Sequence, residues 1–137
     1  GISDIAIDYT NPNIIYIATG DADANFTGGD YYTRSNGVMK SIDGGNTWNP
    51  TGLGALSQSN IGINRLLIDP SNPQILLASS NAGISRTVNG GTNWTQVQTS
   101  PFSDMDFHPT NHNYLYATSG YGANYGGNGS PNYINHV

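Results

Sequence analysis

The chain of 137 residues lacks cysteine and glutamate, and it is poor in charge, with four Lys and Arg together and nine acidic residues, all of them Asp. The absence of cysteine excludes disulfides, thiol catalysis and zinc–cysteine sites. Four cations spread over the chain cannot neutralise a row of phosphates, so the composition argues against nucleic acid as a partner. No apolar run approaches the roughly 20 residues that a membrane-spanning helix needs, so we expect no membrane span.

Small polar and turn-forming residues take the place of the missing charges. The sequence has 18 Gly and 7 Pro, and it is rich in Asn, Ser and Thr. Strong helix formers are correspondingly scarce. This composition disfavours helical bundles and favours an all-β fold with many tight turns.

An internal repeat gives the strongest sequence signal. Residues 2–19 read ISDIAIDYTNPNIIYIAT, residues 63–80 read INRLLIDPSNPQILLASS, and residues 102–119 read FSDMDFHPTNHNYLYATS. A second element, GVMKSIDGGNTWNPT at 37–51, recurs as GISRTVNGGTNWTQV at 83–97. The second and third copies begin 39 residues apart, and the longer first interval contains an insertion at about 21–36. A period near 40 with β-type content predicts propeller blades of four antiparallel strands.

Each repeat contains apolar patterns typical of strands. Apolar residues alternate with other residues in three places, as is typical of a half-buried strand. They are Ile5 and Ile7, Leu66 and Ile68, and Met105 and Phe107. The runs IIYIAT, ILLASS and YLYATS predict strands buried on both faces. We therefore expect one blade at 1–51, a second at 52–97, and a partial third at 98–137 that reaches only its second strand and ends in a Gly/Asn/Tyr-rich loop. Such a two-and-a-half-blade unit needs the remaining blades of a longer chain, or self-association, to close a ring.

Two short motifs predict structured turns between the third and fourth strands. Residues 41–48 fit S-x-D-x-G-x-T-W at every defined position, and residues 87–94 are a weaker copy. A short Asp or Asn side chain accepts backbone hydrogen bonds within such a turn, glycine permits positive φ, and Trp supplies an anchor. A catalytic or metal-binding role for Asp43 is the alternative. The residues assigned to turn architecture are Ser41, Asp43, Gly45, Thr47, Trp48, Thr87, Asn89, Gly91 and Trp94.

On these motifs the chain resembles an Asp-box (bacterial neuraminidase repeat) β-propeller, similar to sialidases, sortilin-type receptor domains and xyloglucanase-type glycoside hydrolases. The paired repeat elements are especially similar to large secreted proteins of Bacteroidetes, many of them exported by the type IX secretion system. The resemblance implies a secreted or cell-surface bacterial protein, with secretion machinery as a further partner. It is specific for fold and poor for activity, because the shared residues are architectural.

The expected topology places three long segments on the face opposite the motif turns: 20–36, 52–62 and the tail after Ser119. Carboxylates beside aromatic rings in the first segment suit a sugar site, although a solvated loop is the alternative reading. The predicted ligand-binding residues are Asp21, Asp23, Asp30, Tyr31, Tyr32 and Arg34. Asp21 and Asp23 are also weak candidates for Ca²⁺, the one cofactor considered, but the twelve-residue calcium loop is absent.

Two function classes follow from this face. The first is a non-catalytic scaffold that binds a glycan or a protein, and the sequence favours it because the similarity is architectural. The second is a glycoside hydrolase in which Asp21 is the weak catalytic candidate, because Tyr16–Asp21 resembles the Y-A-R-T-like run that precedes a catalytic Asp in xyloglucanase-type enzymes. The run departs from that pattern at Ala18 and Gly20. Sialidase chemistry fits less well, since the chain has no Glu. His108 is interpreted as a turn residue rather than a catalytic one.

Overall fold

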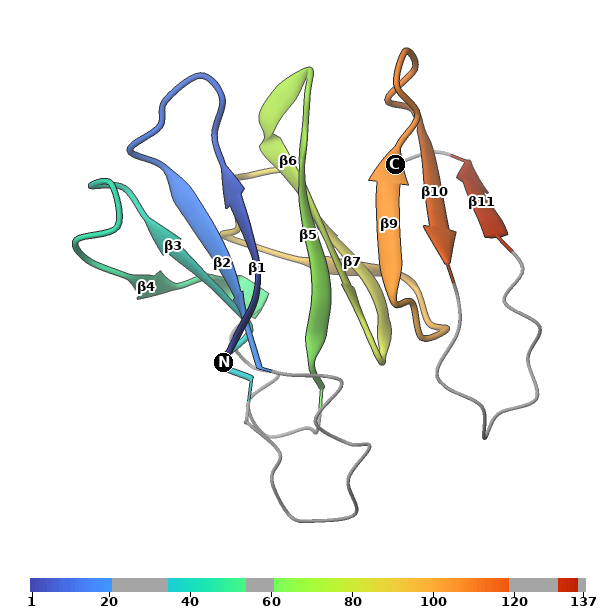
Figure 1. Cartoon of the computed structure of the whole chain (residues 1–137), viewed down its shortest axis with the longest axis horizontal. Coiled ribbons are helices and arrows are strands. Elements are labelled where there is room, and N and C mark those ends of the chain that lie inside the picture. Colours follow the sequence, from blue (N-terminus) through green and yellow to red (C-terminus); the bar gives the residue numbers. More distant parts are fainter. Residues whose placement is uncertain (21–34, 54–60, 119–130, 136–137) are drawn as a thin grey trace.

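The computed structural model describes residues 1–20, 35–53, 61–118 and 131–135, and every regular element of three or more residues in these ranges is a β-strand (Figure 1). The first sheet has the strand order β1-β2-β3-β4 and the second β5-β6-β7-β8, with all neighbouring strands antiparallel. The all-β prediction with four-stranded antiparallel sheets is therefore confirmed. No helix in the described part of the chain is long and apolar enough to cross a membrane.

The strands follow the repeat seen in the sequence. The first sheet comprises β1 (Ile2–Ile7), β2 (Ile15–Thr19), β3 (Val38–Ser41) and β4 (Asn49–Pro50). The second comprises β5 (Ile63–Asp69), β6 (Asn72–Ser80), β7 (Gly83–Thr87) and β8 (Thr95–Gln98). The third comprises β9 (Asp104–Phe107), β10 (Tyr114–Thr118) and β11 (Pro131–Asn135).

The third sheet corrects one expectation. The sequence predicted that it would reach only its second strand and that the Gly/Asn/Tyr-rich end would be a loop, but β11 pairs with β10 over Tyr114–Thr118 and completes three strands. Residues 131–135 contain Pro and two Asn, which are poor strand formers. Pairing with an adjacent strand outweighed this local preference.

The three sheets lie side by side, with the first strands of neighbouring sheets in contact (Figure 1). The connections β1–β2, β5–β6 and β9–β10 lie at the upper end of the view. The C-terminal ends of β2 and β10 and the N-terminal end of β5 lie at the lower end. The described residues that flank 21–34, 54–60 and 119–130 are thus at one end of the sheets, opposite the motif turns.

The hydrophobic core lies between the sheets. One cluster joins the first and second sheets and consists of Tyr16, Ala18, Val38, Leu53, Ile63, Leu66, Leu76 and Ala78. The other joins the second and third and consists of Leu77, Ile84, Phe102, Met105, Phe107, Leu115 and Ala117. Adjacent residues of β6 belong to different clusters because successive strand residues point to opposite faces. The second sheet is therefore buried on both sides.

Burial confirms the predictions for the second strands in two sheets and corrects the third. The central residues of β2 and β6 are buried on both faces, whereas β10 alternates between exposed and buried positions. Tyr114 and Tyr116 of β10 are partly exposed, and the His108 ring lies beside both of them. The alternating residues Ile5 and Ile7 of β1 are also largely exposed.

A β-bulge near the start of β1 and β5 sets which residues face the core. The register shifts between Ile2 and Asp4, and at the equivalent place between Ile63 and Arg65. A bulge inserts one extra residue and re-aims the side chains that follow. Ile63 and Leu66 therefore both reach the core although they are three positions apart.

Truncating a side chain in the core between the first two sheets should destabilise the protein strongly. Leu66 is almost fully buried there, and we expect Leu66→Ala to lower the free energy of unfolding by about 2–5 kcal/mol. Val97→Ala on β8 is the control, because Val97 is exposed. Urea unfolding measures both, and equal effects of the two variants would contradict the assignment of this core.

Candidate functional site

The predicted ligand-binding side chains lie outside the described residues, so the structure does not bring them together or separate them. They are Asp21, Asp23, Asp30, Tyr31, Tyr32 and Arg34. The same holds for the Ca²⁺ candidates Asp21 and Asp23. Within the described ranges, no three His or Asp side chains gather in a way that could hold a metal ion.

The structure describes the residues on either side of 21–34. Thr19, Gly20 and Ser35 are called the base of this segment. The Ser35 hydroxyl donates to the Thr19 carbonyl at 2.6 Å, and the Thr19 hydroxyl donates to the Gly37 carbonyl at 2.8 Å. Gly20 has φ of +93°, and a Cβ there would lie 2.7 Å from the Ser35 Cβ. Glycine is needed at this position for both reasons. Gly20 is the extra residue relative to the xyloglucanase-like run. Its lack of a side chain allows the chain to pass close to Ser35, where the insertion begins and ends.

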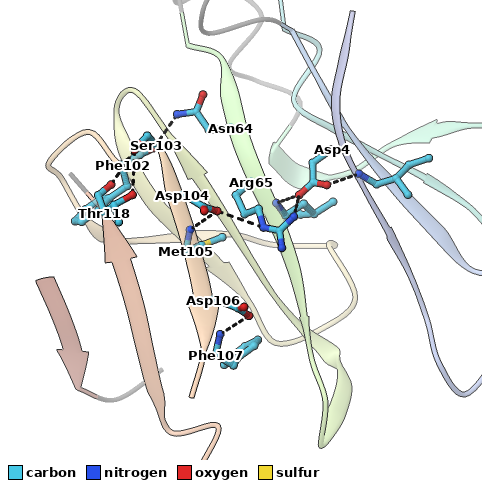
Figure 2. Close-up of polar contacts among 12 residues, drawn as sticks. Asp4, Asn64, Arg65, Phe102, Ser103, Asp104, Met105, Asp106, Phe107 and Thr118 are labelled. Atoms are coloured by element: carbon cyan, nitrogen blue, oxygen red, sulfur yellow. Dashed lines mark hydrogen bonds and ion pairs between the residues drawn. The ribbon is translucent and has the colours of Figure 1, made fainter. Parts of the chain in front are cut away.

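Three charged residues on the first strands form an ion layer across all three sheets (Figure 2). Arg65 of β5 lies between Asp4 of β1 and Asp104 of β9, with Nη1 3.4 Å from Asp4 Oδ2 and Nε 3.5 Å from Asp104 Oδ1. Asp4 is mostly buried and Asp104 is exposed. The three residues occupy equivalent positions of the three repeats. A positive charge on the second sheet therefore faces a negative charge on each of the two neighbouring sheets. No sequence motif marks this layer, although the three residues align with one another in the repeat.

Backbone hydrogen bonds tie the ion layer to the strands. Asp4 Oδ2 also accepts the Leu66 N–H at 2.8 Å, and the Asn64 side-chain amide donates to the Phe102 carbonyl at 2.7 Å (Figure 2). Buried carboxylates are tolerated when their oxygens are paired in this way. Asp4 therefore helps to hold the first two sheets together.

The turn at 41–48 is built around the Asp43 carboxylate. Its Oδ1 accepts the Ser41 hydroxyl at 2.7 Å and the Thr47 N–H at 2.9 Å, and its Oδ2 accepts the Thr47 hydroxyl at 2.6 Å. Hydrogen bonds from the side chain and backbone of Thr47, and then from the Ser41 hydroxyl, lower the pKa of Asp43 to about 2. The Trp48 indole N–H closes the turn by donating to the Gly45 carbonyl at 3.0 Å. These hydrogen bonds all join residues of the turn itself.

The turn at 87–94 has the same geometry with weaker groups. Asn89 Oδ1 accepts the Thr87 hydroxyl and the Asn93 N–H, each at 2.9 Å. The Trp94 indole N–H donates to the Gly91 carbonyl at 3.1 Å. An amide supplies only one acceptor oxygen. The second turn therefore lacks the bond that the second carboxylate oxygen makes in the first turn.

A third set of turns follows β1, β5 and β9. Asp8 Oδ1 accepts the Thr10 N–H at 2.8 Å, and Asp69 Oδ1 accepts the Ser71 N–H at 2.7 Å. In the third repeat His108 Nδ1 lies 3.2 Å from the Thr110 nitrogen and accepts its N–H in the same way. Burial opposes ionisation of Asp8, but the hydrogen bonds from Thr10 and from the Asn11 N–H hold its pKa below the usual value. These contacts support a turn role for His108.

Comparison with known proteins finds sequence similarity to xyloglucanases. No protein-family model matches the chain. A xyloglucanase of Acetivibrio thermocellus, Xgh74A, is 32% identical over 108 residues, which is 74% of this chain and 12% of that protein. A xyloglucanase of a Paenibacillus species is 30% identical over 109 residues, 74% of this chain and 10% of that protein. The chain therefore spans about a tenth of the length of these relatives.

A solved structure supports the fold. The crystal structure of an ancestral GH74 enzyme superposes with a TM-score of 0.65 and 21% identity, over 87% of this chain and 13% of that chain. At this identity the likeness bears on the fold alone. Together with the three antiparallel sheets, it identifies the chain as a partial β-propeller, related in sequence to a segment of the xyloglucanases.

Acid should selectively weaken the first motif turn. The pKa of Asp43 is lower in the folded chain, at about 2, than the usual 3.8, so its ionised form favours folding. This contribution is complete above about pH 4 and is lost as the pH falls toward 2. We expect the difference in unfolding free energy between the native protein and Asp43→Asn to shrink over this range.

The reverse substitution in the second turn is the matched control. Asn89→Asp introduces a carboxylate among similar donors, so its stability relative to the native protein should fall as the solution is acidified. Urea unfolding between pH 2 and about pH 6 measures both differences. A difference for Asp43→Asn that stays constant with pH would contradict the role given to the carboxylate.

Removing the central cation of the ion layer should weaken the contact between sheets. We expect Arg65→Met to lower the free energy of unfolding by about 1–2 kcal/mol, because the partly buried Asp4 carboxylate loses its counter-charge. Double-mutant cycles with Asp4→Asn and Asp104→Asn apportion the effect. The coupling should be larger with Asp4, which is the less exposed partner. Equal coupling to both carboxylates would contradict this description.

Proposed function

We propose that this chain is part of a glycoside hydrolase-type β-propeller that acts on a xyloglucan-type polysaccharide outside the cell. The observation that carries the proposal is the sequence similarity to two xyloglucanases over about three quarters of the chain. The preference for a purely binding scaffold, drawn from the sequence alone, gives way to the hydrolase because of this similarity. The two motif turns, at 41–48 and 87–94, are proposed to be Asp boxes that maintain the scaffold.

The proposed substrate side is the end of the sheets at which residues 21–34 depart. The base formed by Thr19, Gly20 and Ser35 fixes the two ends of this segment. Rigid scaffolds commonly present their functional residues on such connections. The carboxylates and aromatic rings of residues 21–34 suit sugar hydroxyls and the apolar faces of sugar rings. Asp21 directly follows Gly20 and is the proposed catalytic residue of this segment.

Hydrolysis of a glycosidic bond requires a second carboxylic acid, typically ~6.5–9.5 Å from the first in inverting enzymes. The described carboxylates are poorly suited to this role. Asp8, Asp43 and Asp69 accept hydrogen bonds within turns, and Asp4 and Asp104 contact Arg65. Asp106 of β9 accepts the N–H of its neighbour Phe107. We therefore propose that the second acid comes from another part of the polypeptide.

One observation favours a second candidate, a propeller that binds the glycan without cleaving it. Ala18 stands where the xyloglucanase-like run has Arg, and it is fully buried in the core between the first two sheets. This position therefore cannot supply a cation to a substrate. Binding by the aromatic and acidic residues of the same segment does not require that cation.

Substitution of Asp21 in the intact polypeptide distinguishes the two functions. With xyloglucan oligosaccharides as substrate, we expect Asp21→Asn to reduce turnover by at least about 100-fold, because a general acid or base contributes 10²–10⁴-fold. Isothermal titration should show binding within about threefold of the native protein, since one carboxylate is removed among several contacts. Asp23→Asn is the matched control and should retain most of the turnover.

Two results would separate the alternatives. A native protein that binds the oligosaccharides but releases no product supports the binding function and contradicts the hydrolase. A native protein that hydrolyses them with Asp21→Asn unimpaired supports a hydrolase but rejects Asp21 as its catalytic residue.

A further inference from the structure

The turn between β9 and β10 uses a different acceptor from the equivalent turns of the other two sheets. Asp8 and Asp69 supply a carboxylate oxygen in the first and second sheets. In the third sheet His108 Nδ1 accepts the N–H groups of Thr110 and Asn111, each at 3.2 Å. The three turns lie at the same end of the sheets (Figure 1). One position of the repeat is therefore filled by two kinds of group whose charges respond differently to pH.

The position of the ring proton follows from these hydrogen bonds. Two N–H groups point at Nδ1 of His108, so this nitrogen carries no proton and the neutral ring has its proton on Nε2. A second proton can bind only at Nδ1, where it removes the lone pair that both N–H groups use. Burial opposes ionisation of Asp8, but hydrogen bonds from Thr10 and from the Asn11 N–H keep its pKa below the usual value. The Asp8 carboxylate therefore remains an acceptor near neutral pH.

Two tyrosine rings of β10 lie beside the His108 ring. The Tyr116 ring is stacked on it, with centroids 5.8 Å apart and planes at 28°, and the Tyr114 centroid is 6.2 Å away. Tyr16 has the position of Tyr116 in the first sheet, and there the Lys40 nitrogen lies 5.1 Å from the centre of the Tyr16 ring. The distances to Tyr116 and to Tyr16 are both within the range of a cation–π contact. A protonated His108 ring would therefore keep a favourable contact with Tyr116 after it has released the turn.

The other titratable groups near this turn are engaged elsewhere. Asp106, on the same side of β9 as His108, accepts the Phe107 N–H at 2.8 Å, and Asp69 accepts hydrogen bonds within its own turn. His112 packs edge-on against the Phe107 ring, with centroids 6.0 Å apart. Among the described residues, no ion pair joins His108 to a carboxylate. A proton on His108 thus competes with the hydrogen bonds of the turn and is not held by a salt bridge there.

We propose that the turn between β9 and β10 is a pH-sensitive switch, which neutral His108 holds closed and which opens when a proton binds at Nδ1. The proton comes from solvent, the N–H groups of Thr110 and Asn111 pass to water, and the charged ring stays stacked on Tyr116. The closed turn is present above the range in which imidazole groups titrate and is lost as the pH falls through that range. The first two turns, with carboxylate acceptors, stay closed. This inference does not depend on the proposed function.

Hydrogen exchange of the intact polypeptide, followed by mass spectrometry of its peptides, tests the switch. The protection of residues 108–113 is compared with that of the equivalent turns, 8–13 and 69–74, at about pH 8 and at about pH 5. Each rate is divided by the intrinsic exchange rate at the same pH, so that the comparison reports opening of the turn. We expect protection of 108–113 to fall at least about fivefold on acidification, and that of the other two turns to change less than about twofold.

Three variants separate His108 from other causes. His108→Asp restores the acceptor of the other repeats, and its turn should have the same protection at both pH values. His112→Asn removes the other imidazole of the turn and should retain the full pH response of the native protein. If His108→Asp does not fold, His108→Asn takes its place, because Asn89 shows that an amide oxygen accepts a backbone N–H in a turn of this chain.

Four results would overturn the switch. The first is unchanged protection of 108–113 between the two pH values in the native protein, and the second is an equal loss in all three turns, which would show a global effect. The others are a turn that still opens in acid in His108→Asp, or one that no longer opens in His112→Asn. Either would place the titrating group elsewhere. A loss of protection that is confined to 108–113 and abolished by the substitution of His108 alone supports the proposal.

Discussion

Packing of each sheet against the next is the constraint on which the rest of this structure depends. A single antiparallel sheet of four short strands has no interior, so its apolar side chains are buried only when a second layer covers them. The second sheet shows the complete arrangement, with Leu76 in one core and its neighbour Leu77 in the other. A propeller satisfies this requirement by radial repetition. The stability of any one sheet is therefore a property of its neighbours as much as of its own sequence.

The motif turns supply polar contacts between neighbouring sheets. A turn can satisfy its own backbone groups locally when a side chain within it accepts their hydrogen bonds. Asp43 and Asn89 do so by accepting N–H groups four residues ahead, and glycines at the next two positions allow the close approach. The carbonyl of Gly90 then remains available to Tyr16 and Lys40. The motif can therefore form hydrogen bonds within the turn while the Gly90 carbonyl accepts hydrogen bonds from the preceding sheet.

The sequence predicted those parts of the fold that depend on local pattern. The strands, the antiparallel sheets and the motif turns follow from alternation, from the repeat and from turn-forming residues, all of which act over a few positions. The bulge before Asp4 and Arg65 was not predicted, because it depends on the pairing register with the adjacent strand. The strand β11 was missed for a similar reason, since pairing with β10 supplies what its own residues lack.

The candidate site was less predictable than the fold. Arg65 has no motif, and its position between two carboxylates follows only from the packing of three first strands. The proposed ligand residues were found from local composition alone, and the described structure adds the base of their segment through Thr19, Gly20 and Ser35. Local composition identifies chemical groups, but their distances from a substrate depend on the whole assembly.

The carboxylates in the described part of the chain serve the turns and the contacts between sheets. Of its nine acidic residues, six are in the described part, and each of these accepts at least one hydrogen bond there. Two of the six, Asp4 and Asp104, are also paired with Arg65. Hydrogen bonds from Thr47 and Ser41 hold the pKa of Asp43 at about 2, which makes this carboxyl a poor proton donor near neutral pH. The three that remain, Asp21, Asp23 and Asp30, all lie within residues 21–34, so a third of the acids of a chain poor in charge falls in one segment that begins directly after Gly20.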